Sequence, residues 1–212
     1  MVAIAAAALV FAGFARTFYL RSLFSPGPLT ALFVVHGIVF TSWFAVLIVQ
    51  VFLVAGRRVD LHRQLGVVGA VIALAMVILG PLAAINAARH GMSLEFLATP
   101  LADIIVFALL VGTALWFRRR PDIHKRLMAT ATIAILPPAV ARLPSDWFAG
   151  PLEVFGTTDV ILLAVIVWDT VQRRRLHPAF LWGGLLLIAS HPLRVMFAET
   201  SVWLSIARWL TS

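Results

Sequence analysis

Long apolar runs alternate with short polar segments along this chain. Hydropathy divides it into seven such runs, at residues 2–20, 30–54, 64–88, 99–117, 127–146, 157–172 and 178–197. Most are near the ~20 residues that a helix needs to cross a bilayer, and few charges interrupt them. The pattern therefore predicts an all-α integral membrane bundle of about seven transmembrane helices, formed as one domain by residues 1–198.

Composition supports a membrane environment. The 212 residues are 62% hydrophobic and only 12% charged, whereas soluble domains carry about 25% charged residues. A soluble core of this size could not hide so much apolar surface. The absence of cysteine excludes disulfides, thiolate catalysis and cysteine-ligated metal clusters.

Local signals modify two of the runs. Pro137 and Pro138 should break the fifth run, because proline lacks the N–H that continues a helix. Residues 1–15 resemble the apolar part of a signal peptide, but Arg16 and Arg21 follow this stretch rather than precede it. We therefore expect a retained first helix.

Three polar segments repeat one pattern, a basic cluster followed by a histidine. RRVDLHRQL (57–65) and RRPDIHKRL (119–127) match position by position, and QRRRLHPAF (172–180) matches more loosely. Eleven of the 17 Lys and Arg lie in or beside these segments: Arg57, Arg58, Arg63, Arg118, Arg119, Arg120, Lys125, Arg126, Arg173, Arg174 and Arg175. The opposite loops carry fewer cations, with Arg21, Arg89, His90, Glu95, Asp146 and Glu153.

Such clusters usually face the cytoplasm, which predicts a cytoplasmic N-terminus, an external C-terminus and a multi-pass protein of the bacterial inner membrane. The net charge of +8 is then a topology signal that also attracts anionic lipids. It does not indicate a nucleic-acid partner.

Ionisable groups inside a membrane are costly and often functional. Toward the predicted outer ends of the runs lie Arg16, His36, Asp103, Arg142, Asp159, His191 and Arg194. A low-spin haem b needs two imidazoles on opposite sides of its iron, and His36 and His191 are the two histidines well inside predicted helices. Arg16, Arg142 and Arg194 would bind the propionates, and Asp103 or Asp159 would orient a ligand. The alternatives are interhelical hydrogen bonds and ion pairs, or a metal-ion or proton-relay role.

A second group lies at the predicted cytoplasmic face. His62, His124 and His177 each begin a helix directly after a basic cluster. In a structural interpretation, Asp60 and Asp122 cap the helix starts and the histidines bond loop carbonyls. A second haem would use His62 and His124, because their segments match so closely. A zinc site built from all three histidines is a further alternative.

Three smaller patterns complete the expectations. Asp169 and Arg173 are spaced for an i, i+4 ion pair. His36, Trp43 and Gln50 share one helix face, which should point into the bundle. In the tail, residues 199–212, one face carries Trp203, Ile206, Trp209 and Leu210. The tail is therefore either an amphipathic interfacial helix or an extension of the seventh helix.

The segment FVVHGIVFTSWFAVLIVQVFLVAGRRVDLHRQLG resembles bacterial polytopic membrane proteins that pair a mid-helix histidine with an LHRxLG helix start. RPDIHKRLMATATIAILPPAVARLP and RLHPAFLWGGLLLIASHPLR resemble the rest of that family, so the resemblance runs from Phe11 almost to the end. These motifs indicate membership but no activity. The layout is also similar to membrane b-type cytochromes and haem-handling proteins of respiratory assembly, which would carry over to His36, His62, His124 and His191.

Seven predicted helices with histidines and aspartates at one depth also resemble the ceramidase and progestin-receptor superfamily of zinc hydrolases. That family has HxxxH in its last helix, whereas here Val195 stands four residues after His191. This departure argues against a zinc hydrolase.

The leading hypothesis is a haem b-binding membrane protein in electron transfer or haem handling. The alternative is a non-catalytic accessory subunit or assembly factor of a larger respiratory or photosynthetic membrane complex, with other membrane subunits as partners. The two roles are compatible, and the sequence leaves open whether the protein is an enzyme.

Overall fold

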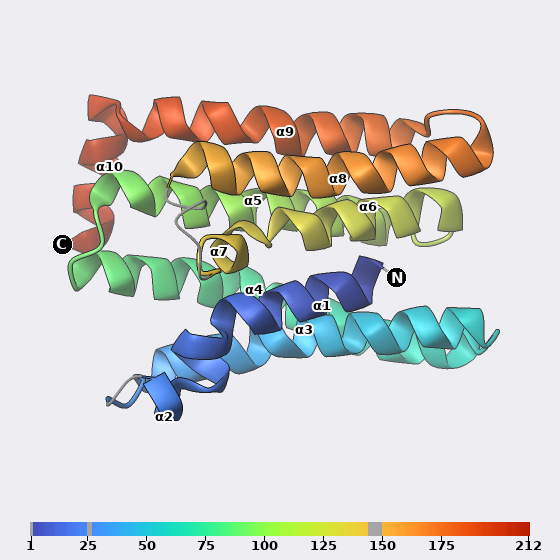
Figure 1. Cartoon of the computed structure of the whole chain (residues 1–212), viewed down its shortest axis with the longest axis horizontal. Coiled ribbons are helices and arrows are strands. Elements are labelled where there is room, and N and C mark those ends of the chain that lie inside the picture. Colours follow the sequence, from blue (N-terminus) through green and yellow to red (C-terminus); the bar gives the residue numbers. More distant parts are fainter. Residues whose placement is uncertain (1, 25–26, 144–149) are drawn as a thin grey trace.

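The computed structural model describes residues 2–24, 27–143 and 150–212, which form an all-α membrane helical bundle (Figure 1). Six helical segments of this described part are long and apolar enough to cross a bilayer. They are Val2–Tyr19, which joins α1 (Val2–Phe14) to the π-helix η1 (Ala15–Tyr19), α3 (Ala31–Ala55), α4 (Val59–Arg89), α5 (Leu94–Trp116), α8 (Pro151–Arg173) and α9 (Pro178–Ala198). The predicted fold class is confirmed.

The predicted fifth run is a broken helix. It forms α6 (Pro121–Ala134) and the short α7 (Pro137–Val140), and the break falls directly before Pro137 and Pro138, as expected from the missing N–H groups. Asp146 and the end of this predicted run lie outside the described residues. By contrast, Pro81 lies inside the continuous helix α4.

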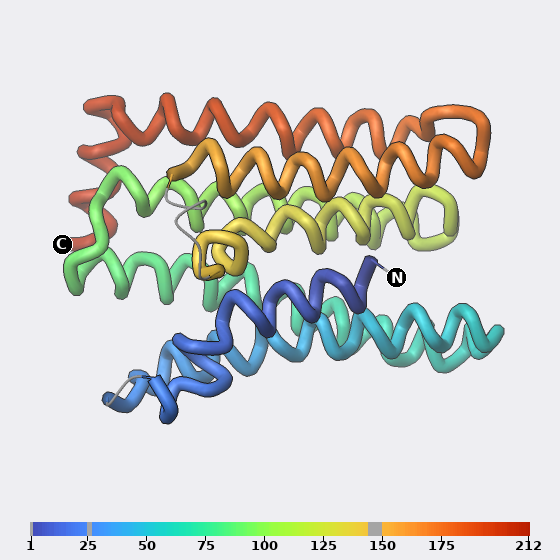
Figure 2. The backbone as a smooth tube through the Cα atoms, viewed as in Figure 1, coloured from blue at the N-terminus to red at the C-terminus, as the bar shows by residue number. Residues whose placement is uncertain are grey.

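Three helical hairpins turn at the same end of the bundle. Figure 1 shows the α3–α4, α5–α6 and α8–α9 connections together at one end, and α10 (Ser201–Thr211) at the other. Each basic segment spans one of these connections and an adjoining helix end, so the cations of all three segments share one end of the molecule. The trace in Figure 2 shows that α1 runs from the side of the hairpins toward the opposite end. Which end faces the cytoplasm stays a prediction.

The order of the helices across the bundle decides which side chains can meet. Figure 1 places α3 along one edge and α8 and α9 along the opposite edge, with α4, α5 and α6 between them. In agreement, α3 packs mainly on α4 and α1, whereas α9 packs on α5, α6 and α8. Residues at similar depth on α3 and α9 are therefore far apart.

Helix α1 is an integral part of this packing. A Cβ added at Gly13 would lie 2.1 Å from the carbonyl oxygen of Ala139 on α7, so the two backbones approach as closely as only glycine allows. The first helix thus packs directly on the short segment α7. This contact requires the break in the fifth run, because α7 turns away from the direction of α6 (Figure 1).

Candidate functional site

The ionisable groups predicted near the outer face form separate clusters. In the first cluster, Arg194 on α9 pairs with Asp103 on α5, and both side chains are at most 4% exposed. Arg194 also donates to the carbonyl and the hydroxyl oxygen of Ser190, at 3.1 and 2.7 Å. Each of the three guanidinium nitrogens of this arginine therefore donates to a protein group.

His191 lies beside that ion pair. Its Nδ1 is 2.9 Å from an oxygen of Asp159 on α8, but neither atom has an aligned hydrogen-bond partner among the described residues. The imidazole stacks on Phe155 at 4.5 Å between ring centres, and the Arg194 guanidinium lies 5.2 Å from the same ring. Asp159, rather than Asp103, is the carboxylate that contacts this histidine.

The remaining predicted residues lie elsewhere. His36 on α3 stacks on Phe40 at 4.1 Å. Arg16 on η1 lies over Phe24. Arg142 lies over Phe14 and donates to the Pro138 carbonyl at 2.7 Å. None of these partners is His191 or a residue in contact with it.

The structure therefore does not bring His36 and His191 together. They belong to α3 and α9, at opposite edges of the bundle (Figure 1), and one iron cannot bind both imidazoles across the intervening helices. Arg194, expected to bind a propionate, is paired with Asp103 instead. The outer residues do not fit a haem held by His36 and His191.

His62 and His124 are brought together at the basic end. Their ring centres are 6.4 Å apart and their planes are inclined by 82°. Each is the fourth residue of its helix, since α4 begins at Val59 and α6 at Pro121. The two segments match in sequence and lie at the same end of neighbouring hairpins. Their imidazoles therefore lie at the same depth in the bundle.

The hydrogen bonds of this pair leave ring nitrogens free. His124 Nδ1 lies 2.8 Å from the carbonyl oxygen of Ala114; since a carbonyl only accepts, Nδ1 donates and neutral Nε2 keeps its lone pair. His62 Nδ1 is buried without a hydrogen-bond partner in the described part of the chain. Gln50 donates to the His62 carbonyl at 3.1 Å. Buried polar atoms normally have partners. His62 Nδ1 and the lone pair of His124 Nε2 are therefore available to bind a ligand.

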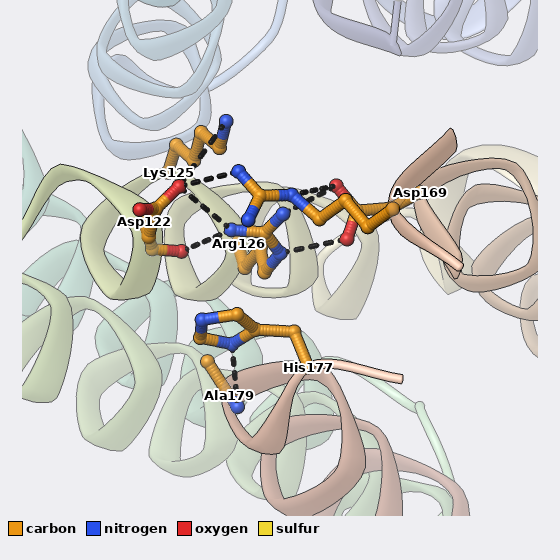
Figure 3. Close-up of polar contacts among 7 residues, drawn as sticks. Asp122, Lys125, Arg126, Asp169, His177 and Ala179 are labelled. Atoms are coloured by element: carbon orange, nitrogen blue, oxygen red, sulfur yellow. Dashed lines mark hydrogen bonds and ion pairs between the residues drawn. The ribbon is translucent and has the colours of Figure 1, made fainter. Parts of the chain in front are cut away.

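His177 does not join this pair. It precedes α9, and its Nδ1 accepts a hydrogen bond from the backbone N–H of Ala179 at 3.1 Å, which caps the helix (Figure 3). Partial burial and the nearby cations Arg126 and Arg173 lower the pKa of His177. Over residues 2–24, 27–143 and 150–212, no three His, Asp or Glu side chains are placed to hold a metal ion. The described residues thus give no support to a zinc site.

An ion network around the buried side chain of Arg126 links α6 to α8 (Figure 3). The sequence predicted only its contact between Arg173 and Asp169. Arg126 is 1% exposed and donates to both oxygens of Asp169, at 2.8 and 2.6 Å. The predicted contact between Arg173 and Asp169 is present at 3.8 Å, but Arg126 is the main partner of Asp169. One feature of the sequence could have indicated the role of Arg126. The two closely matching segments differ at this position, where the first has Gln64.

Contrary to the expectation from the sequence, Asp60 and Asp122 do not cap the starts of α4 and α6. Neither α4 nor α6 has a side-chain cap, and their N-cap residues are Arg58 and Arg120. Asp122 instead accepts from Arg173 at 2.6 Å, and this arginine is the main cause of its lowered pKa.

Comparisons of the chain with protein-family models, curated proteins and solved structures gave no match.

Proposed function

We propose that this protein binds haem b through His62 and His124 and serves in electron transfer or haem handling. The supporting observation is the 6.4 Å separation of the two ring centres. Two imidazoles that bind one iron through nitrogens at about 2 Å have ring centres about 6 Å apart. The spacing of this pair therefore suits axial ligation, whereas the placement of His36 and His191 does not.

Neighbouring groups support this assignment. The hydrogen bond from His124 Nδ1 to the Ala114 carbonyl fixes the ring orientation, as outer-shell partners of metal-bound histidines do. Arg57, Arg58 and Arg63 flank His62, and Arg118, Arg119 and Arg120 precede His124. These cations are suited to bind propionates by charge-assisted hydrogen bonds. Haem bound here would supply one-electron redox chemistry.

The proposal includes a location. By the positive-inside rule, the end that holds His62 and His124 faces the cytoplasm of a bacterial cell, and the end that holds α10 faces outward. The haem would then lie near the cytoplasmic surface of the inner membrane.

Visible absorption tests the haem assignment. The full-length protein, purified in mild detergent, should show the sharp reduced α-band of six-coordinate haem after dithionite is added. Replacing His62 or His124 by Ala should abolish that band, because one axial ligand is lost. Replacing His36, His191 or the loop residue His90 by Ala should leave it unchanged.

Three results would contradict the proposal. These are a wild-type protein without haem, a normal band in both His62→Ala and His124→Ala, and a band lost only in His36→Ala and His191→Ala. Each variant is first checked for a single symmetric peak in size-exclusion chromatography. A His62→Gln variant serves if His62→Ala does not fold, since its side chain fills similar space without an imidazole.

A further inference from the structure

Helix α10 has three different faces, and this arrangement indicates where the helix lies relative to the membrane. We propose that α10 sits at the boundary between lipid and water, with the acyl chains of the bilayer against a face formed by Val202, Ile206 and Trp209. The proposal concerns the end opposite His62 and His124 and does not depend on haem binding.

The first face packs on the bundle. Trp203 is 6% exposed and Ala207 is fully buried, and both pack in one cluster with Leu97 and Ala98 of α5. The indole N–H of Trp203 donates to the Leu94 carbonyl at 2.8 Å. This side of α10 is covered by the chain itself and is unavailable to other partners.

The second face is apolar and uncovered. Val202, Ile206 and Trp209 are 61%, 41% and 75% exposed, and their spacing of four and three residues places them on one side of the helix. Three large apolar side chains on one short helix form a patch that favours an apolar environment.

The third face is polar. It carries Ser201, Ser205, Arg208 and Ser212, which are all exposed. At 3.6 residues per turn, the centres of the three faces lie roughly a third of a turn apart. A helix that has protein, apolar side chains and polar side chains on three sides suits a site where protein, lipid and water meet.

The position of α10 identifies the apolar partner as lipid. Leu193 and Met196, on the last turns of the membrane-spanning helix α9, are 63% and 69% exposed, so an apolar surface reaches the end of that helix. Thr200 then accepts from the N–H of Trp203 and starts α10, which turns across the end of the bundle (Figure 1). Val202 therefore follows directly where the lipid-facing surface of α9 ends. Tryptophan is also enriched at this depth of a membrane.

A contact at the other end of α10 holds it in this orientation. Arg89, the last residue of α4, donates to the carbonyl oxygens of Leu210, Thr211 and Ser212, at 3.4, 3.3 and 2.9 Å. A cation at a helix C-terminus is favourable, because it compensates the unpaired carbonyls there. With Trp203 and Arg89 as anchors, α10 cannot rotate and exchange its faces.

Site-directed spin labelling tests this arrangement, since the chain has no cysteine and each label therefore has a unique site. Three variants report on the apolar face: Val202→Cys, Ile206→Cys and Trp209→Cys. Their neighbours Ser201→Cys, Ser205→Cys and Arg208→Cys report on the polar face. The full-length protein is reconstituted in phosphatidylcholine–phosphatidylglycerol vesicles, and relaxation by oxygen, which concentrates in lipid, is compared with relaxation by a water-soluble nickel chelate.

We expect oxygen to dominate at 202, 206 and 209 and the nickel chelate to dominate at 201, 205 and 208. Leu193→Cys on α9 and His90→Cys in the α4–α5 connection calibrate lipid and water. Nickel access at all six positions would place α10 outside the membrane and overturn the proposal. Exclusion of both reagents from 202, 206 and 209 would identify a protein partner instead of lipid, and oxygen access at all six would show a submerged helix. Each of these results contradicts the proposal.

Discussion

Replacing Arg194 by Leu should destabilise the bundle by about 3–5 kcal/mol, which is the usual effect of leaving one partner of a buried ion pair alone. Asp103 would then be a carboxylate at 3% residue exposure, without the guanidinium that pairs with it. Ser190 would also lose its hydrogen bond from Arg194. Thermal unfolding of the purified protein in detergent, followed by circular dichroism, measures the loss.

The double variant Asp103→Leu, Arg194→Leu should recover most of this stability, because a buried pair replaced by apolar residues leaves no uncompensated charge. Arg208→Leu is the matched control, since Arg208 is exposed on α10. A single variant no less stable than this control, or a double variant less stable than Arg194→Leu, would show that the pair does not stabilise the bundle as described.

Replacing Arg126 by Met should cost about 2–3 kcal/mol, since hydrogen bonds to charged groups contribute about 1.5–3 kcal/mol. Asp169 would lose both bonds from Arg126, and α6 would lose its clamp to α8. The cost should be smaller than for Arg194, because Asp169 is 20% exposed and water can solvate it in part. Thermal unfolding is again the measurement.

Two substitutions bracket this effect. Arg126→Lys should be intermediate, because lysine keeps the charge but cannot form the two parallel bonds of a guanidinium. Lys125→Met should be nearly neutral, because its contact with Asp122 is 3.7 Å long and both side chains are 57% exposed. If Lys125→Met and Arg126→Met lowered the free energy of unfolding equally, the Arg126–Asp169 pair would have no special role in stability.

The sequence was sufficient to predict features that depend on local chemistry. Length and hydropathy predicted the membrane helices, and Pro137 and Pro138 predicted the break between α6 and α7. Hydropathy does not, however, reveal which helices are neighbours. His36 and His191 have similar predicted depth, yet α3 and α9 lie at opposite edges. His62 and His124 could be paired because their segments share a register, which fixes both depth and position in the helix.

The tail shows a similar limit. The sequence pattern predicts Trp203 and Trp209 on one face, but residues six apart on a helix lie about 120° from each other. Trp203 accordingly faces the bundle while Trp209 is exposed. A helical wheel could have separated them, but only tertiary packing determines which face the bundle covers. The tail is nevertheless a helix of its own rather than an extension of α9.

The electron paramagnetic resonance spectrum of the oxidised protein tests most directly whether His62 and His124 hold a haem. Their ring planes are inclined by 82°, and near-perpendicular axial imidazoles give ferric haem a highly anisotropic low-spin signal. We predict this signal in the wild type and, unchanged, in the His36→Ala, His191→Ala double variant. A high-spin signal, no haem signal, or loss of the signal in this double variant would contradict the assignment. A rhombic low-spin signal, of the kind that parallel imidazoles give, would contradict the perpendicular arrangement of the two rings.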